Sequence, residues 1–292
     1  MQILVTGAAG RLGAYLVELL RARGHEVVGA DVVGDGIERL DVTDWNAVRQ
    51  FVGQLRPEIV LHPAAWTDVD GCARDPERAI IVNGFGAQHM ALAAAAVGAA
   101  VLYVSTNEVF DGRARQPYRE YDQPAPVNAY GYSKLVGERA VAAANPQHYI
   151  VRTAWLFAHG GKNFIQTILE AAQQGRQLRI VTDEVANPTY NQDLAEAIAA
   201  LLATGRYGVY HFVNEGAVSR YHFARYFLDR AGWQSLPIDP IAGAQWQRAS
   251  RPPVYTALSN LAGRHIGIQL RPWQAAVDAF LRREGWLTDS AE

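Results

Sequence analysis

The chain has 292 residues, 49% of them apolar, so it can bury a substantial core and is not globally disordered. Its net charge of −2 gives no electrostatic footprint for binding nucleic acid or an anionic membrane. The single cysteine, Cys72, excludes an intramolecular disulfide and any site built from several cysteine ligands. The first residues lack the features of a signal peptide, so we expect a soluble protein of the cytoplasm.

Short, continuously apolar segments alternate with helix-length segments through the first half of the chain. The expected strands are residues 2–6, 26–30, 59–62, 100–105 and 148–153, and the expected helices are residues 11–23, 44–55, 76–97 and 129–144. Continuous apolarity is typical of strands in a parallel sheet that helices cover on both faces. The alternation therefore predicts an α/β fold with a doubly wound parallel sheet, the Rossmann arrangement.

The alternation becomes less regular after about residue 154. Helices are expected at residues 163–174, 192–202, 220–231 and 273–283, and strands at 178–182 and 209–213, one strand for each of two domains. Aromatic and Gly/Pro-rich segments separate these elements. We therefore expect a larger domain over residues 1–153, to which a segment of about 191–213 returns, and a smaller domain over residues 154–292.

Three glycines with the spacing Gly-x-x-Gly-x-x-Gly follow the first strand and open the first helix. Gly7 can take the positive φ of a tight turn, Gly10 lacks a Cβ where a pyrophosphate approaches, and Gly13 lets the helix lie close to the sheet. The free N–H groups and the dipole of the helix start then attract phosphate. A purely structural glycine turn is the alternative. The context favours a dinucleotide-binding larger domain, which leaves the smaller domain to bind substrate.

An acidic residue ends the second predicted strand. Asp31 can accept hydrogen bonds from both hydroxyls of a nucleotide ribose and repels a 2′-phosphate, and no arginine adjoins it. It therefore favours NADH over NADPH, although a solvated turn residue is the alternative. Asp41 and Val42 are placed to flank an adenine, and Asp41 could equally cap the next helix, as could Thr43 or Asp44.

A tyrosine and a lysine share one face of the helix expected at residues 129–144. Tyr130 and Lys134 are four residues apart, and an ammonium beside a phenol lowers the pKa of the phenol. Tyr130 can then donate a proton to a carbonyl oxygen as hydride arrives, or remove one in reverse. Thr106 ends a strand of the sheet, where a hydroxyl can polarise that carbonyl. The three residues predict nicotinamide-dependent carbonyl reduction or its reverse.

Longer motifs resemble those of the dTDP-4-dehydrorhamnose reductases, a family of extended short-chain dehydrogenases. The similarity extends over essentially the whole chain. It rests on residues 64–70, 105–112, 130–138 and 152–155, with Asn163-Phe164, Asp183, Pro188-Thr189 and Arg251-Pro252 ahead of Leu258. The resemblance implies reduction of the 4-keto group of dTDP-4-dehydro-6-deoxy-L-mannose to dTDP-L-rhamnose, with NADH or NADPH as hydride donor.

The resemblance also implies roles for individual residues. Those that would bind the cofactor come from the glycine loop and the strand ends that follow it: Gly7, Gly10, Arg11, Leu12, Gly13, Asp31, Asp41, Val42, Ala64, Ala65, Trp66 and Thr67, with Tyr130 and Lys134. Those that would be catalytic are Thr106, Tyr130 and Lys134. Thr106, Asn107 and Trp155 would contact the sugar nucleotide. Arg251 is placed either to contact its diphosphate or to form a surface salt bridge, as is Arg248.

Two short segments depart from the pattern of the family. Asn107-Glu108 stands where the family has Asp-Tyr, and Asp183-Glu184 stands where it has Asp-Gln. The change at Glu108 removes an aromatic surface and adds a negative charge near the sugar, so the sugar itself can differ. Two alternatives stay open: a ketoreductase for another sugar nucleotide, and a non-catalytic NAD(P)-binding regulatory subunit resembling that of methionine adenosyltransferase.

The remaining expectations concern metals and partners. None of the eight histidines has another histidine or a carboxylate at a metal-ligand spacing, so no metal site is predicted. The expected partner is a dTDP-linked 4-keto sugar, with neither nucleic acid nor a membrane. A homodimer is one assembly that the sequence allows.

Overall fold

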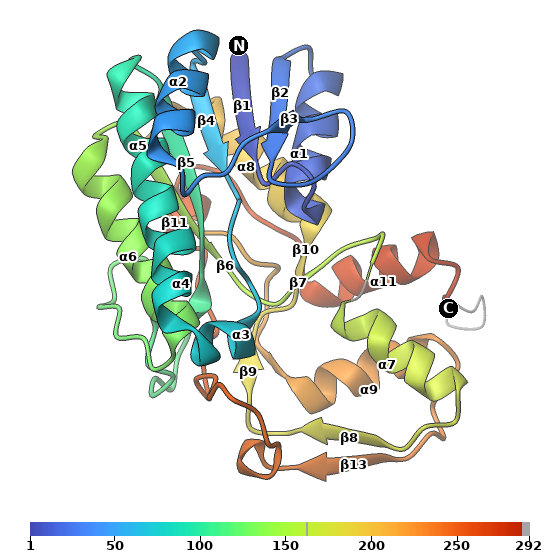
Figure 1. The fold of residues 1–292 in the computed structure, drawn as a ribbon. Helices are drawn as coiled ribbons and strands as arrows, with labels where there is room; N and C mark the ends of the chain where they lie inside the picture. The colour runs from blue at the N-terminus through green and yellow to red at the C-terminus, as the bar shows by residue number, and fades with distance from the viewer. Residues whose placement is uncertain (162, 288–292) are drawn as a thin grey trace.

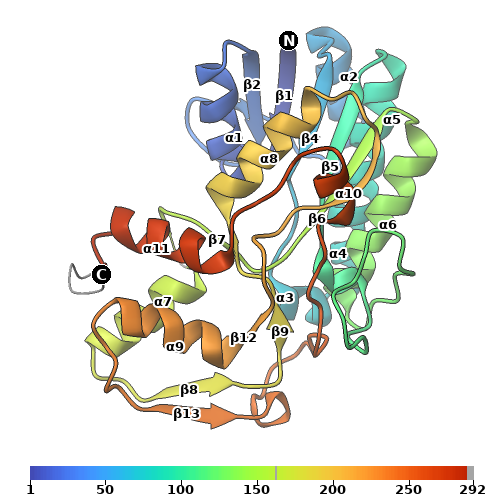
Figure 2. The same cartoon turned by 180° about the vertical axis from the view of Figure 1, so that it is seen from behind.

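The computed structural model describes residues 1–161 and 163–287, and its main feature is a seven-stranded parallel sheet (Figures 1 and 2). The strand order is β11-β6-β5-β4-β1-β2-β3, so the order reverses between β4 and β1. The strands are β1 (Gln2–Thr6), β2 (Glu26–Asp31), β3 (Glu38–Arg39), β4 (Ile59–His62), β5 (Ala100–Thr106), β6 (His148–Thr153) and β11 (Gly208–His211). This doubly wound sheet confirms the predicted fold class.

Helices cover both faces of the sheet. One layer contains α2 (Trp45–Leu55), α5 (Gly86–Ala96) and α6 (Ala129–Ala144), and the other contains α1 (Arg11–Ala22), α8 (Asn191–Leu202) and α10 (Leu261–His265). Successive residues of a strand point to opposite faces. In β1, Ile3 and Val5 therefore pack in the core under α1 and α8, whereas Leu4 packs in the core under α2 and α5. Because both faces are buried, the strands are continuously apolar.

The helix expected over residues 76–97 contains a π-helical turn. It consists of α4 (Pro76–Ile80), the π turn Ile81–Phe85 and α5, and it follows the short helix α3 (Val69–Arg74). By length and composition, the run Pro76–Ala96 is the one helix of the described residues that could cross a membrane. Ala87, Met90 and Ala91 are completely buried in the core against the sheet. The run is therefore apolar because it is a core helix.

The second half of the chain forms a smaller lobe, at the lower right of Figure 1. It contains the helices α7 (Phe164–Gln173), α9 (Arg220–Arg230) and α11 (Trp273–Arg283), and the strand pairs β8 (Leu178–Val181) with β13 (Ile238–Ile241), β7 (Leu156–Phe157) with β10 (Thr189–Tyr190), and β9 (Val185–Ala186) with β12 (Val218–Ser219). Its core is rich in aromatic side chains. The segment that carries α8 and β11 leaves this lobe and joins the large sheet. Residues 162 and 288–292, which belong to the predicted domain 154–292, lie outside the described residues.

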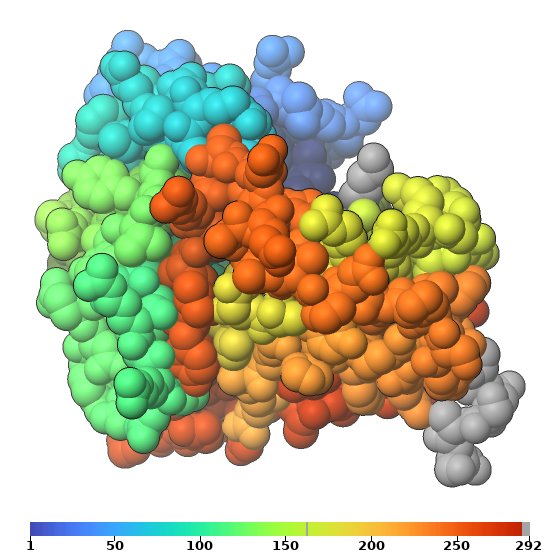
Figure 3. All heavy atoms as spheres, turned by 90° about the horizontal axis from the view of Figure 1, so that it is seen from below, coloured from blue at the N-terminus to red at the C-terminus, as the bar shows by residue number. Residues whose placement is uncertain are grey.

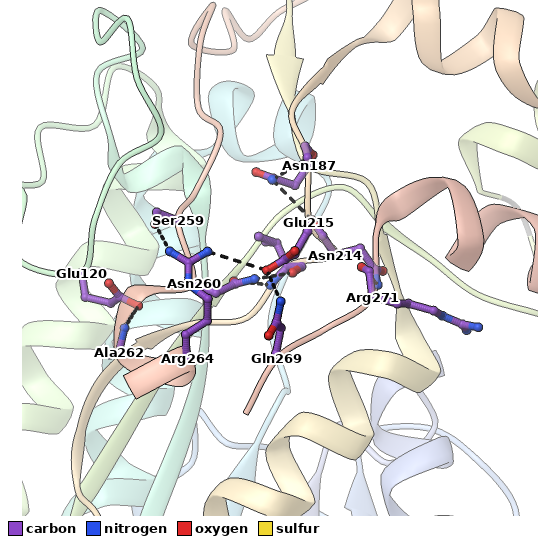
Figure 4. Close-up of polar contacts among 12 residues, drawn as sticks. Glu120, Asn187, Asn214, Glu215, Ser259, Asn260, Ala262, Arg264, Gln269 and Arg271 are labelled. Atoms are coloured by element: carbon purple, nitrogen blue, oxygen red, sulfur yellow. Dashed lines mark hydrogen bonds and ion pairs between the residues drawn. The ribbon is translucent and has the colours of Figure 1, made fainter. Parts of the chain in front are cut away.

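Buried amides tie the C-terminal segment to the sheet (Figure 4). The side chain of Asn260 accepts from the Val213 amide at 3.0 Å and donates to the Val213 carbonyl at 2.8 Å. Asn214 donates to the Arg271 carbonyl at 3.0 Å. These bonds anchor the chain from Asn260 onward. The segment between β13 and Asn260 lies between the two parts of the molecule when seen from below (Figure 3, orange).

One buried ion pair fixes α6 against the neighbouring strands. Arg152 of β6 donates to both carboxylate oxygens of Glu138 in α6, at 2.9 and 2.7 Å, and both side chains are 5% exposed. The Ser105 hydroxyl of β5 donates to the same carboxylate at 2.5 Å. Glu138 is one helical turn from Lys134, and Ser105 precedes Thr106. The ion pair fixes α6 against β6, and the Ser105 hydrogen bond fixes it against β5, so that Glu138 sets the register between the two elements that carry the predicted catalytic residues.

Replacing Glu138 with alanine should destabilise the protein strongly, because Arg152 would keep a buried charge without a partner. We expect the free energy of unfolding to fall by about 3–5 kcal/mol, measured by urea denaturation. Glu196→Ala, which removes the partner of Arg23 in an exposed ion pair, is the matched control and should cost less than about 1 kcal/mol. Equal losses in the two variants would contradict this account of α6.

Candidate active site

A cleft of about 1260 Å³ opens at the carboxyl ends of β1, β2, β4, β5 and β6, beside the smaller lobe. This is the edge at which the strand order reverses, where open α/β sheets bind their ligands. All but two of the residues predicted from the sequence line this cleft: Gly7, Gly10, Arg11, Leu12, Gly13, Asp31, Asp41, Val42, Ala64, Ala65, Trp66, Thr67, Thr106, Asn107, Tyr130, Lys134 and Trp155. The exceptions are Arg251 and Arg248.

The glycine loop leaves room for a phosphate group above the start of α1. Gly7 has a φ of +64°, and a Cβ there would lie 2.8 Å from the Ala64 backbone. A Cβ at Gly13 would lie 2.1 Å from the Gly7 carbonyl oxygen, so only glycine lets the helix approach the loop. No side chain caps α1, whose first N–H groups can therefore bind an anion. The loop fits a dinucleotide pyrophosphate.

The two acidic residues along this edge are held by local hydrogen bonds. Asp31 accepts from the Ala9 amide at 3.0 Å and from the Val32 amide at 2.7 Å, which fixes its carboxylate at the end of β2. Asp41 accepts from the amide and the hydroxyl of Thr43, at 2.9 and 2.7 Å. Asp44 caps α2. Asp41 is therefore not the helix cap, and its carboxylate lies in the wall of the cleft.

A buried asparagine, which sequence reasoning missed, fixes the segment after β4 that lines the cleft. Asn83 lies in the π turn and is completely buried. Its side chain accepts from the Trp66 amide at 2.7 Å and donates to the Trp66 carbonyl at 3.0 Å and to the Ser133 hydroxyl at 2.9 Å. It thus joins the strand end after β4 to α6. The sequence signal that could have revealed this residue is a single asparagine within an otherwise apolar helical run.

The structure brings Thr106, Tyr130 and Lys134 together. Asn128 caps α6 by accepting from the Gly131 amide at 2.8 Å, so that the helix starts just before Tyr130. Thr106 and Tyr130 line the same part of the cleft, close enough for the Thr106 hydroxyl to act on the pKa of Tyr130. Lys134 is buried one turn further along, with Nζ 4.1 Å from the centre of the Tyr103 ring.

The expected lowering of the Tyr130 pKa by Lys134 is wrong for this structure. Burial raises the pKa of Tyr130 well above its usual value, and the negative charge of Glu108 raises it further, against a smaller opposing effect of the Thr106 hydroxyl. Burial also lowers the pKa of Lys134 to about 7, although Glu138 opposes this. Desolvation thus outweighs the attraction between phenolate and ammonium that the spacing suggested.

A second cavity, of about 270 Å³, adjoins the cleft and shares Glu108 and Trp155 with it. Trp155 has a φ of +42°, a strained conformation for a tryptophan. The guanidinium of Arg220 lies 3.6 Å from the centre of its ring. Glu184 forms ion pairs with Arg220, at 3.7 Å, and with Arg248. The cavity thus has a charged wall contributed by the smaller lobe.

The proposed diphosphate contact of Arg251 is not supported. Arg251 is exposed and lines neither cavity, and its carbonyl oxygen accepts from Asn128 at 3.4 Å. Arg248 and Arg220 face the smaller cavity instead. Arg251 points outward because its segment passes the cavity with the buried Ser250 and Pro253 facing inward. In this segment, the basic residue that lines the cavity is Arg248, three positions before Arg251.

Asn107 lines the cleft, but its side chain is engaged within the protein. It donates to the Thr256 hydroxyl at 2.6 Å and accepts from the Thr106 hydroxyl at 3.2 Å. It therefore links the end of β5 to the segment that follows β13. Among the described residues, no three histidine, cysteine, aspartate or glutamate side chains gather in a group that could hold a metal ion.

The parallel sheet, the glycine loop at its switch point and the added C-terminal lobe are those of an extended short-chain dehydrogenase/reductase, a class that uses a nicotinamide cofactor. The model of the RmlD substrate binding domain family matches residues 1–285. The chain belongs to this family, the dTDP-4-dehydrorhamnose reductases.

Individual relatives agree with this assignment. The spore coat polysaccharide biosynthesis protein SpsK of Bacillus subtilis is 35% identical, over 99% of each chain. A dTDP-4-dehydrorhamnose reductase of Streptomyces griseus is 38% identical, over 94% of this chain and 91% of its own. The structure of a dTDP-4-dehydrorhamnose reductase of Bacillus anthracis in complex with NADP superimposes with a TM-score of 0.91 at 32% identity, over 97% of this chain and 99% of its own.

Replacing Gly13 with alanine should weaken cofactor binding, because the new Cβ would collide with the Gly7 carbonyl and displace α1 from the loop. We expect the Kd for NADH and NADPH to rise at least about tenfold, measured by fluorescence titration. Gly53→Ala in α2, where a Cβ meets nothing within 4 Å, is the control and should bind like the unmodified protein. Unchanged affinity of Gly13→Ala would place the pyrophosphate elsewhere.

Proposed function

We propose that the chain catalyses the NAD(P)H-dependent reduction of the 4-keto group of a dTDP-4-dehydro-6-deoxy sugar, with dTDP-4-dehydrorhamnose as substrate and dTDP-L-rhamnose as product. The observation that carries the proposal is that Thr106 and Tyr130 meet in one cleft, with Lys134 one helical turn from Tyr130. The dTDP-4-dehydrorhamnose reductases among its relatives support the choice of substrate.

The three residues would act on one carbonyl oxygen. Thr106 would donate a hydrogen bond to it and polarise the carbon. Tyr130, whose pKa is raised, holds its proton at neutral pH and would transfer it to the oxygen as the alcohol forms. When bound, the reduced nicotinamide supplies the hydride that adds to the carbonyl carbon. Lys134, when protonated, would stabilise the phenolate that remains.

Replacing Tyr130 with phenylalanine should remove the proton donor without changing the shape of the cleft. We expect kcat to fall by about 10²–10⁴ with dTDP-4-dehydrorhamnose, while the Kd for the cofactor stays the same. Turnover is followed by the loss of the reduced-nicotinamide absorbance. Tyr132→Phe, two residues away and 51% exposed, is the matched control and should retain full activity.

Two outcomes would count against the proposal. A Tyr130→Phe variant as fast as the unmodified protein would exclude this mechanism. Failure of the unmodified protein to reduce any dTDP-linked 4-keto sugar, with cofactor binding intact, would favour the regulatory subunit considered from the sequence.

We also propose that the chain prefers NADH. The Asp31 carboxylate is held at the end of β2 by two backbone amides, where it can accept from ribose hydroxyls and would repel a 2′-phosphate. The related Bacillus anthracis protein binds NADP, so the preference is a property to be tested in this chain.

Replacing Asp31 with alanine should raise the kcat/KM ratio of NADPH to NADH at least about tenfold, because the charge that repels the 2′-phosphate is removed. The measurement compares initial rates with each cofactor. Asp35→Ala, an exposed residue in the loop after β2, serves as control and should leave the ratio unchanged. The same ratio in Asp31→Ala and the unmodified protein would show that Asp31 does not select the cofactor.

We further propose that the reaction takes place in the cytoplasm and that the chain forms a homodimer. The exposed apolar side chains of Ile81, Phe85 and Leu92, on one helical run, support an interface between copies. Light scattering on the purified protein would give the mass of the assembly.

A further inference from the structure

A carboxylate lies where the cleft and the smaller cavity meet. Glu108 lines both, two residues after Thr106 in the 3₁₀ turn Asn107–Val109 that follows β5. Its amide donates to the Thr106 hydroxyl at 3.2 Å, and its charge acts on Tyr130. Glu108 is therefore beside the position at which Thr106 and Tyr130 would hold the reacting carbonyl.

The arginines of the smaller cavity are paired with a different carboxylate. Arg220 and Arg248 both form ion pairs with Glu184, and Arg220 also stacks on the ring of Trp155. Within residues 1–161 and 163–287, Glu108 forms no ion pair, and the one hydrogen bond to its carboxylate comes from Asn128 to Oε2, at 2.6 Å. The second oxygen, Oε1, is thus left to accept from a ligand.

The smaller cavity contains a second polar group without a partner. Ser250 is 3% exposed, and its hydroxyl has no hydrogen-bond partner in the part of the chain that the structure describes. A buried hydroxyl without a partner costs free energy, which a hydroxylated ligand can recover. Together with Glu108 and the charged wall, this hydroxyl suits a sugar rather than an apolar group.

We propose that Glu108 determines sugar specificity by accepting a hydrogen bond, at Oε1, from the hydroxyl on the carbon next to the reacting carbonyl. This inference rests on the proposed function. Thr106 and Tyr130 would fix the carbonyl oxygen, and Glu108, in the turn that Thr106 caps, lines both cavities, so its carboxylate would face the neighbouring carbon. A sugar without that hydroxyl would leave Oε1 of a half-buried carboxylate without a partner, and such sites discriminate strongly.

The test compares the unmodified protein with Glu108→Gln on two substrates, a dTDP-4-keto-6-deoxyhexose and its 3-deoxy counterpart. Glutamine preserves the shape of the side chain and an acceptor for Asn128, but it has no charge. Because the single amide oxygen remains with Asn128, an NH2 donor replaces Oε1 and the sugar hydroxyl loses its acceptor, so we expect kcat/KM for the hydroxylated sugar to fall about tenfold. For the 3-deoxy sugar, kcat/KM should change less than about twofold or increase.

Glu77→Gln is the matched control, because Glu77 is exposed in α4 and lines neither cavity. It should leave both values of kcat/KM unchanged. An equal loss for the two sugars in Glu108→Gln would overturn the inference and leave Glu108 a role in positioning Thr106 or Tyr130. If the unmodified protein reduces neither sugar, the proposed function itself fails, which is a different result.

Discussion

The close packing of α6 against the end of β5 is the constraint on which the site depends. A Cβ at Gly131 would lie 2.0 Å from the carbonyl oxygen of the turn after β5, and a Cβ at Gly137 would lie 2.4 Å from a buried tyrosine hydroxyl. The ion pair of Glu138 fixes the same helix along its axis. This approach brings Tyr130 into the cleft beside Thr106. Two glycines and one buried carboxylate thus position the groups that would act on substrate.

The same packing sets the electrostatics of the site. Burial raises the pKa of Tyr130, and it lowers that of Lys134 to about 7. Glu108 adds a negative charge beside Tyr130 and is itself partly desolvated, so that its pKa is raised. A tyrosine in such surroundings retains its proton at neutral pH, which suits a general acid for reduction better than a base for oxidation. The direction proposed for the reaction is thus consistent with the burial of the phenol.

The smaller lobe supplies the charged wall of the smaller cavity. Glu184, Arg220 and Arg248 come from three separate segments, and they meet Glu108 only in the folded chain. The strained backbone of Trp155, the first tryptophan after β6, turns the chain from the sheet toward this lobe. The Rossmann sheet would therefore supply the redox site, whereas the wall that faces the sugar depends on how the lobe folds back onto it.

The sequence by itself determined six of the seven strands of the sheet, the glycine loop and the spacing of Tyr130 and Lys134, because these features depend on residues a few positions apart. It did not reveal the π turn at Asn83, nor that Arg248 rather than Arg251 faces the cavity, nor the raised pKa of Tyr130. Each of these depends on contacts between distant segments and on the loss of water around the side chains. Only the tertiary structure decides such contacts, because burial is a property of the whole packed chain.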